Sequence, residues 1–592
     1  MSRPSARALL TAVAVAVAGI SFPGPAAAQE AGGATLVASA GQITWGGSVG
    51  LSGVLEATEG CAAVRPIELQ HLTAGASSWD VVATGATGAD TTFAFSALPE
   101  HTGAFRAVAG ATEECAEVVS PEVVVTVSAL VANVLGSATL GAGHCTGVSV
   151  SVSPNKAGQE VRLQRARTWG WQTIATVAVA EDSVVVAKTC FGWDDIGMVR
   201  LRARWPAQDS LNAAGSGPAV ALKVVKARWM RRIDRLTAGR SISVSVREAG
   251  EHLYRRRDTD RRIPASNQKL LLSMAVLDAL GPDFRFETRV VGPAFSGSVV
   301  DGNIWIVGRG DPTTARGQMR RLARRLVEAG IRRVRGSVIG SKTYFARDWW
   351  APGWRWYFPS YHVALPTALT FRGNRSSSGT HVRDPERRAA AFLTRRLKAL
   401  GVRVNGDPAA GRVPSGLVEL ASVRSDPLAE ILRQMNVWSS NFHAEVLGKR
   451  LAVESAGAPG TIAAGARATT GWAADHGAAI TAYDSSGLSY ANRVTAAGLA
   501  RLLGVAERLS WGRGLRNSLP AGGGGTLDDR LGRVRVRAKT GTLIGVSALS
   551  GYVWLERLDT WAEFSILSNG MSKSTAVRIE DAVVRILSDR AR

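Results

Sequence analysis

Three short strings of the sequence carry side chains that could perform acyl transfer through a serine ester. They are Ser266-Asn267-Gln268-Lys269, Ser439-Ser440-Asn441 and Lys539-Thr540-Gly541-Thr542. A serine hydroxyl is a weak nucleophile unless a base takes its proton, and Lys269 stands three positions after Ser266. At the start of a helix this spacing places both side chains on one face, within hydrogen-bonding reach. The first string therefore predicts a nucleophile together with its base.

The second string and the lysine of the third would complete the proton-transfer groups. Ser439 offers a hydroxyl that can relay a proton to a leaving amine, and Asn441 offers a donor and an acceptor to a substrate amide. Lys539 would be the neighbouring cation that lowers the pKa of a buried Lys269 and so allows it to act as a base.

The remainder of the third string is suited to holding a substrate. Lys539 and Thr540 would bind a terminal carboxylate, and Gly541 would let a substrate backbone lie close along the strand. The N–H groups of Ser266 and Thr542 would form an oxyanion hole, helped by the positive end of the helix that follows Ser266.

Each string alone is weak. Ser153-Pro154-Asn155-Lys156 repeats the first pattern and Ser210-Leu211-Asn212 repeats the second. Taken singly, the serines could be helix caps and the third string a tight turn. Order and spacing favour a site, because Ser439 lies 173 positions after Ser266 (439 − 266) and Lys539 lies 100 positions after Ser439 (539 − 439).

The segments around the strings predict the elements that would position them. Apolar residues at helical spacing follow Ser266 until Gly281-Pro282, the second string begins another helix, and the third lies on a strand. Asp384-Pro385 predicts a helix start with Asp384 as its cap. Strands are expected at 241–246, 252–256, 534–543, 547–555 and 562–567, and a last helix at 574–588. Helices combined with strands from distant segments predict an α+β domain.

The N-terminus has the pattern of a processing signal. Arg3 and Arg7 precede the apolar run 8–20, and Ala26-Ala27-Ala28 would permit cleavage before Gln29. A membrane anchor is the alternative, although the run is short for a spanning helix. We interpret residues 1–28 as a signal peptide. We expect a secreted or extracytoplasmic protein, cell-wall or periplasmic, with no transmembrane anchor after cleavage.

The cysteines agree with export. Cys61, Cys115, Cys145 and Cys190 all lie in the first third of the chain, and four cysteines allow three pairings. We favour Cys61–Cys115 and Cys145–Cys190, since each pair then lies within one repeat, and an oxidising compartment would preserve such bonds. The region of the three strings holds no cysteine, which argues against thiol chemistry there. We expect no metal and no cofactor.

The chain is strongly basic, with a formal charge of +23. Nucleic acid is the usual partner of such a protein, but export argues against it. Anionic cell-wall polymers or lipid headgroups are the alternative partners of the basic surface. A second interpretation is also kept, in which the arginine-rich composition has no binding role.

Residues 29–226 have the composition of β-structure. Short alternating runs, such as 148–152, are separated by turn residues in the manner of an antiparallel sandwich. Ile67-Glu68-Leu69-Gln70 before Trp79 is echoed by Val161-Arg162-Leu163-Gln164 before Trp171. We therefore predict two immunoglobulin-like domains, 29–127 and 128–226, as spacers or wall-binding modules, followed by a catalytic domain at 227–592.

Residues 227–592 resemble the class C low-molecular-mass penicillin-binding proteins, the D-alanyl-D-alanine carboxypeptidase/endopeptidase family. Besides the three strings, the resemblance rests on Gly308-Arg309-Gly310-Asp311-Pro312-Thr313, Ala444-Glu445 and Asp484-Ser485-Ser486-Gly487-Leu488-Ser489 with Asn492-Arg493. It implies a penicillin-binding-protein/β-lactamase-type transpeptidase domain. It also implies an acyl-enzyme on Ser266, with peptidoglycan stem peptides and β-lactams as ligands. Carboxypeptidase and endopeptidase activity stay equally open.

The chain departs from that family in its insert and its N-terminal region. The gap between the first two strings is shorter than usual, so we infer a single inserted domain at about 290–420. The tandem β-domains are additional. Two alternative functions remain: a β-lactamase or esterase with the same site, and a catalytically silent wall-binding protein.

Overall fold

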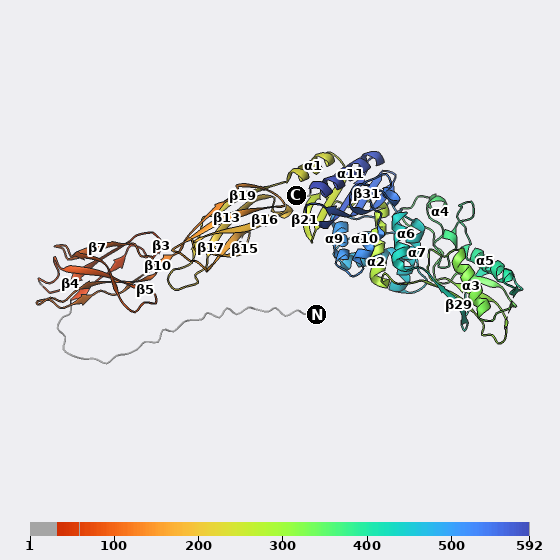
Figure 1. The fold of residues 1–592 in the computed structure, drawn as a ribbon, viewed down its shortest axis with the longest axis horizontal. Helices are drawn as coiled ribbons and strands as arrows, with labels where there is room; N and C mark the ends of the chain where they lie inside the picture. Colours follow the sequence, from red (N-terminus) through yellow and green to blue (C-terminus); the bar gives the residue numbers. More distant parts are fainter. Residues whose placement is uncertain (1–31, 59, 591–592) are drawn as a thin grey trace, which may run out of the picture. The chain divides into compact units, whose positions relative to one another are not determined.

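The computed structural model describes residues 32–58 and 60–590 (Figure 1). The signal peptide predicted at 1–28 lies outside these residues. Between residues 32 and 590, apart from residue 59, no helix has both the length and the apolarity needed to cross a membrane. The chain forms two compact units. Of the described residues, the first comprises those up to 136 together with 147–189 and 200–221, and the second comprises 137–146, 190–199 and those from 222 to 590.

The first β region is a sandwich of two sheets. One sheet has the order β1-β4-β2, with β7 also on β4, and the other has the order β3-β10-β8-β5-β6, with β9 on β8. Side chains from both sheets, among them Leu51, Phe93 and Phe105, form one buried core. The strands are β1 Gly33–Ala34, β2 Val37–Ala38, β3 Gln42–Thr44, β4 Val49–Glu56, β5 Pro66–Thr73, β6 Asp80–Ala86, β7 Thr92–Ala97, β8 Gly103–Ala109, β9 Val118–Val119 and β10 Val123–Ser128.

The second β region repeats this topology. Its larger sheet has the order β12-β19-β17-β14-β15 with β18 on β17, which matches the larger sheet of the first region strand for strand, and β11-β13-β16 form the other sheet. The elements are β11 Leu130–Leu135, β12 Thr139–Gly141, β13 His144–Ser153, β14 Glu160–Arg167, β15 Gly170–Ala178, β16 Val184–Phe191, η1 Trp193–Asp195, β17 Gly197–Trp205, β18 Gly215–Ser216 and β19 Val220–Val225.

Local contacts repeat as well. β5 has a register shift at Leu69/Gln70 and β14 has one at Leu163/Gln164. In the first region Arg106 donates to Gln70 and stacks 4.1 Å from the ring of Trp79. In the second, Arg202 donates to Gln164 and stacks 4.2 Å from the ring of Trp171. The echo in the sequence is therefore a structural repeat, while its immunoglobulin-like character and the domain boundaries stay predictions.

The motif-like strings of the second region have a structural role. Lys156 is buried, and its Nζ lies 2.8 Å from an Asp209 carboxylate oxygen and 2.9 Å from Oδ1 of Asn212. Asn212 in turn donates to the carbonyls of Glu100 and Val127. These residues form a buried polar cluster that joins the two β regions.

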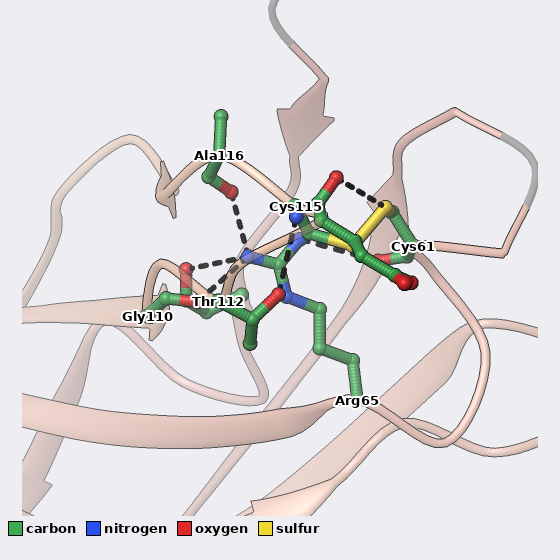
Figure 2. The surroundings of a disulfide bond; sticks show 8 residues. Cys61, Arg65, Gly110, Thr112, Cys115 and Ala116 are labelled. Carbon is green, nitrogen blue, oxygen red and sulfur yellow. Dashed lines mark hydrogen bonds between the residues drawn. A yellow bond between two sulfur atoms is a disulfide. The ribbon is translucent and has the colours of Figure 1, made fainter.

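Both predicted disulfides are present, Cys61–Cys115 and Cys145–Cys190. Figure 2 shows the first one beside the side chain of Arg65. The guanidinium donates to the carbonyl of Cys61 at 3.2 Å, of Gly110 at 2.8 Å and of Ala116 at 2.6 Å. Arg65 therefore satisfies backbone carbonyls on both sides of the disulfide.

We predict that Arg65→Met destabilises the first β region by about 2–3 kcal/mol, because buried carbonyls would lose a charged donor. Hydrogen exchange of β5 and β8 in the full chain measures the effect. The exposed Arg162 of β14 provides the matched control, since Arg162→Met should leave exchange unchanged. Equal protection in both variants would contradict the structural role of Arg65.

The central sheet of the second unit has the order β21-β20-β32-β31-β30. Its strands come from both ends of the region: β20 Ile242–Glu248, β21 Glu251–Arg256, β30 Val536–Leu543, β31 Val546–Leu555 and β32 Thr560–Asn569. The helix α11 (Lys573–Arg590) packs on β31, and α1 (Arg228–Thr237) packs beside α11 (Figure 1). β30 lies at the edge of the sheet.

A cluster of helices packs against this sheet and holds the largest apolar core of the region. Its members include Leu271, Leu447 and Leu499, together with Tyr552 of β31. The helical elements are η2 Ala265–Asn267, α2 Gln268–Leu280, α6 Leu428–Val437, α7 Asn441–Ala456, α8 Ile462–Asp475, α9 Ala496–Glu507, α10 Gly512–Ser518 and η4 Gly525–Leu527.

Residues between α2 and α6 form a second α/β layer with its own core. Its sheets have the orders β28-β26-β24-β22-β29 and β23-β25-β27. The elements are β22 Glu287–Gly292, β23 Val299–Val300, β24 Ile304–Val307, α3 Arg316–Glu328, β25 Arg333–Val334, β26 Val338–Ser341, α4 Phe358–Tyr361, η3 Arg372–Asn374, α5 Pro385–Ala399, β27 Arg403–Val404, β28 Ala409–Gly411 and β29 Val418–Arg424.

Buried Lys449 of α7 ties this layer to the helices. Its Nζ donates to the carbonyls of Ala346, Asp348 and Pro366 and lies 2.6 Å from a carboxylate oxygen of Asp348. The helix expected from Asp384-Pro385 is present, and Asp384 occupies the N-cap position of α5. Its carboxylate makes no cap hydrogen bond, however, and lies 3.2 Å from Nζ of Lys342 instead.

Candidate active site

Lys269 lies at the meeting point of three segments. Its Nζ lies 3.0 Å from Oγ of Ser266, 2.8 Å from Oδ1 of Asn441 and 2.5 Å from the carbonyl of Ser486. Ser266 lies in η2, one turn before Lys269 in α2, so the serine-to-lysine spacing places both side chains on one face. No solvent reaches the Lys269 side chain.

This burial sets the charge state of Lys269. Desolvation lowers the pKa of its ammonium group to about 7, against the opposing influence of Asp484 and Glu445. Near neutral pH the group therefore exists both as ammonium and as free amine. As an amine it can accept the proton of the Ser266 hydroxyl while it still donates to the other two partners.

The second and third strings meet through Ser439 and Lys539. Nζ of Lys539 donates to Oγ of Ser439 at 2.8 Å and to the carbonyl of Thr540 at 3.0 Å. Burial lowers the pKa of Lys539 well below its usual value, and the charge of Lys269 adds to the effect. Ser439 and Ser440 have different roles. Ser440 caps α7 by accepting from the N–H of His443, which leaves the Ser439 hydroxyl to Lys539.

β30 presents a free edge to the site. The N–H of Ala538 points away from β31, since it donates to the carbonyl of Pro520 at 3.0 Å. Alternation along a strand then directs the N–H groups of Thr540 and Thr542 to the same outer edge. Gly541 must lack a side chain, because a Cβ there would lie 2.8 Å from the carbonyl oxygen of Pro264. β30 can therefore pass directly beside the turn that carries Ser266.

A loop that the sequence interpretation left without a role supports Lys269 from the other side. Asp484 is fully buried, and its carboxylate accepts from the N–H groups of Gly487 at 3.0 Å and Ser489 at 2.8 Å and from Trp354 at 2.7 Å. This carboxylate holds the loop in the shape that directs the Ser486 carbonyl at Lys269. Only the family-like string Asp484–Ser489 marked the loop in the sequence.

Glu445 is the second group whose role the sequence did not reveal. One turn after Asn441 in α7, its Oε1 accepts from the N–H groups of Ser485 at 3.1 Å and Ser486 at 2.7 Å. Burial, together with the nearby charge of Asp484, raises the pKa of this carboxyl to about 8. The available signal was an acidic residue next to the inward-facing apolar positions of the helix. Glu445 positions the Ser486 carbonyl and adds a titratable group beside Lys269.

The motif residues border one cavity of about 700 Å³. Ser266, Ser439, Asn441, Thr540 and Thr542 all line it, with Lys269 and Lys539 buried behind them. The structure thus brings together the residues predicted from the three strings and leaves out their duplicates at 153–156 and 210–212. In the described ranges 32–58 and 60–590, no group of three His, Cys, Asp or Glu residues has the arrangement of a metal site.

The fold and this cavity define the class of the protein as a low-molecular-mass penicillin-binding protein. The fold resembles penicillin binding protein 4 (dacB) from Haemophilus influenzae, with a TM-score of 0.55 and 22% identity over 60% of this chain and 99% of that one. The same Haemophilus protein in complex with a β-lactam gives a TM-score of 0.51 at 20% identity, with the same coverage.

Sequence comparison gives the family. Residues 230–375 and 360–590 match the D-Ala-D-Ala carboxypeptidase 3 (S13) family, more than half of the chain, and the protein belongs to that family of serine peptidases. It is 31% identical to a D-alanyl-D-alanine carboxypeptidase of Actinomadura sp. (strain R39), over 58% of this chain and 80% of that protein. It is 32% identical to a carboxypeptidase of Mycobacterium tuberculosis, over 54% of this chain and 74% of that protein.

We predict that Gly487→Ala abolishes most D-Ala-D-Ala peptidase activity. Gly487 has a φ of +83°, and a Cβ there would lie 1.9 Å from the carbonyl oxygen of Ala265, in the turn that carries Ser266. The control is Gly545→Ala, with a similar φ of +73° but no heavy atom within 4 Å of the new Cβ. Hydrolysis rates should fall by at least about 100-fold in the first variant only. Similar rates in both variants would show that the contact is not required.

Proposed function

We propose that the chain is an exported serine DD-peptidase that removes D-Ala from peptidoglycan stem peptides through an acyl-enzyme on Ser266. The observation that supports this most directly is the 3.0 Å contact between Oγ of Ser266 and Nζ of Lys269, with Ser439 and Lys539 beside the same cavity. A buried lysine of lowered pKa next to a serine is the arrangement of an activated nucleophile.

In acylation, Oγ of Ser266 attacks the carbonyl carbon of the penultimate D-Ala while the Lys269 amine takes the hydroxyl proton. The resulting oxyanion accepts hydrogen bonds from the N–H groups of Ser266 and Thr542. Collapse of this intermediate breaks the C–N bond. The leaving amine takes the proton that Lys269 accepted, passed on through the Ser439 hydroxyl, which Lys539 holds at 2.8 Å. This transfer returns Lys269 to the free amine. Terminal D-Ala leaves, and an ester on Ser266 remains.

In deacylation, water attacks the ester and Lys269 again accepts the proton, after which Ser266 is restored with release of the shortened peptide. Substrate orientation comes from the groups around the third string. Lys539 and Thr540 bind the terminal carboxylate, and Thr526 holds the Thr540 hydroxyl at 2.8 Å. Asn441 contacts a substrate amide. The same steps would cleave a cross-link in which the carbonyl of D-Ala is joined to an amine of a second stem peptide. That reaction is endopeptidase activity.

Localisation and the basic surface belong to the same proposal. The apolar run and small residues of 1–28 support export, and the two disulfides support an oxidising compartment. A net charge of +23 favours contact with anionic cell-wall polymers there.

A labelled penicillin tests the acyl-enzyme. Wild-type protein should become covalently labelled with one equivalent, and Ser266→Ala should remain unlabelled. Trypsin digestion and mass spectrometry should locate the label on Ser266. No label on wild type, or equal label on Ser266→Ala, would refute the proposal. Rapid loss of the label would instead favour a β-lactamase.

The pH dependence of labelling should follow Lys269. Because its pKa is lowered to about 7, the amine form increases as pH rises through 7, and the labelling rate should rise with it. Glu445, whose own pKa is raised to about 8, is ionised only in the upper part of this rise, where its charge raises the pKa of Lys269. Glu445→Gln should therefore move the upper part of the pH–rate profile to lower pH, while its amide oxygen still accepts from Ser485 and Ser486.

Glu419→Gln, which changes an exposed carboxylate on β29, is the matched control and should leave the pH profile unchanged. Glu445→Ala should lower the rate at every pH, because it also removes the acceptor for the two N–H groups. Superimposable profiles for Glu445→Gln and wild type would exclude an electrostatic role of Glu445.

A further inference from the structure

One side of the cavity is lined by large apolar side chains. We term it the aromatic wall, and it consists of Tyr357, Phe358, Leu488, Tyr490, Leu543 and Ile544. Phe358 and Leu488 are buried in a small apolar cluster that also includes Tyr357, Tyr490 and Leu543. Ile544 is 69% exposed. An exposed isoleucine beside packed aromatic rings offers apolar surface to a ligand.

The wall is held in place by specific contacts. Oη of Tyr490 accepts from the N–H of Ile544 at 3.1 Å, which ties the residue after β30 to the loop after Asp484. The rings of Tyr357 and Phe358 meet edge to face at 5.0 Å. The apolar surface is therefore formed before any ligand binds, and little conformational entropy would be lost on binding.

Charged groups also line this cavity. Arg530 and Lys573 line it next to Thr540, with Lys539 buried behind. Arg530 is paired with Glu580 and Asp581, and Lys573 donates to the carbonyl of Gly541. Among the described residues, none of the side chains that line the cavity is an aspartate or a glutamate. A cationic substituent would find no carboxylate here.

The direction of β30 shows which part of a substrate meets the wall. The proposed carboxylate contacts are at Lys539 and Thr540, and the proposed oxyanion contact is at Thr542. A peptide that adds to this edge continues past Thr542 toward Leu543 and Ile544, at about 3.3 Å per residue. The residue that precedes the D-Ala-D-Ala pair then lies beside the aromatic wall.

We propose that the aromatic wall selects substrates in which the residue before the D-Ala-D-Ala pair has an uncharged side chain over substrates with a free ammonium group there. This inference rests on the proposed function. An ammonium group at the wall loses hydration without gaining a counter-ion, and it lies in a cavity whose other charges are positive. The preferred class includes apolar side chains and side-chain amines already acylated, as in a cross-link.

Two peptides that differ only in this charge test the proposal: Nα-acetyl-Lys-D-Ala-D-Ala with a free ε-amine and the same peptide with an Nε-acetyl group. We expect kcat/KM to be at least about tenfold higher for the Nε-acetylated peptide. Benzylpenicillin and ampicillin, which differ by one ammonium group on the side chain, should show the same order in their rates of acylation of Ser266.

A variant with a new carboxylate at the wall gives the reciprocal test. Ile544→Asp should reduce the preference to about threefold or less, because the free amine then gains a partner. Val418→Asp on β29, which adds a carboxylate at a 43% exposed position outside the cavity, should keep the wild-type preference.

Equal kcat/KM for the two peptides in wild type, or an unchanged preference in Ile544→Asp, would overturn the role of the wall. If wild type still forms a penicilloyl ester on Ser266, the proposed function survives that result. Failure to cleave either peptide, together with failure to form the ester, would overturn both.

Discussion

The contact of the Lys269 side chain with three acceptors is the interaction on which the rest of the site depends. Ser266, Asn441 and Ser486 come from three segments that are far apart in the sequence, and each offers an oxygen to the same nitrogen. A buried amine without partners would be costly, so these oxygens make burial possible, and burial in turn gives the amine its basicity. The fold must therefore hold all three segments in fixed positions relative to one another.

Buried polar groups around Lys269 hold these segments in place. Asp484 organises the loop that contains Ser486, and Glu445 holds the same loop to α7. Lys449, one turn further along α7, fixes the segment that supplies Trp354 to Asp484. The chain has few lysines among its 71 basic residues, yet Lys156, Lys269, Lys449 and Lys539 are all buried. Each of these four lysines places one compact nitrogen group in contact with two or more oxygens.

Much of the fold could be predicted from local patterns. The helices after Ser266 and Ser440 and the strands of the central sheet follow apolar periodicity and turn residues closely. The order of those strands could not be predicted, since β20 pairs with β32 across more than three hundred residues. The predicted side-chain cap at Asp384 is absent because the carboxylate lies against a tertiary partner, Lys342. Tertiary contacts of this kind leave no mark in a local window.

In the candidate site, too, some residues could be predicted from local sequence and others could not. Spacing identified Ser266, Ser439 and Lys539, because each lies at the start of a helix or on a strand where its neighbours are constrained. It could not identify Glu445 or Asp484 as supports, since a buried carboxylate is recognised by the N–H groups around it, and those come from another segment. The residues of the aromatic wall, at 357–358, 488, 490 and 543–544, gave no sequence signal of a shared surface, because they too come from separate segments.

The free edge of β30 has a wider consequence. An unpaired edge invites other strands, and proteins usually cover such edges to avoid association with their own copies. Here Pro520 takes the N–H of Ala538, so the open stretch at 540–542 is short and lies within a cavity. Only a thin, extended chain can complete the sheet at that point. Recognition of a linear peptide and resistance to edge-to-edge aggregation thus come from the same few residues of backbone.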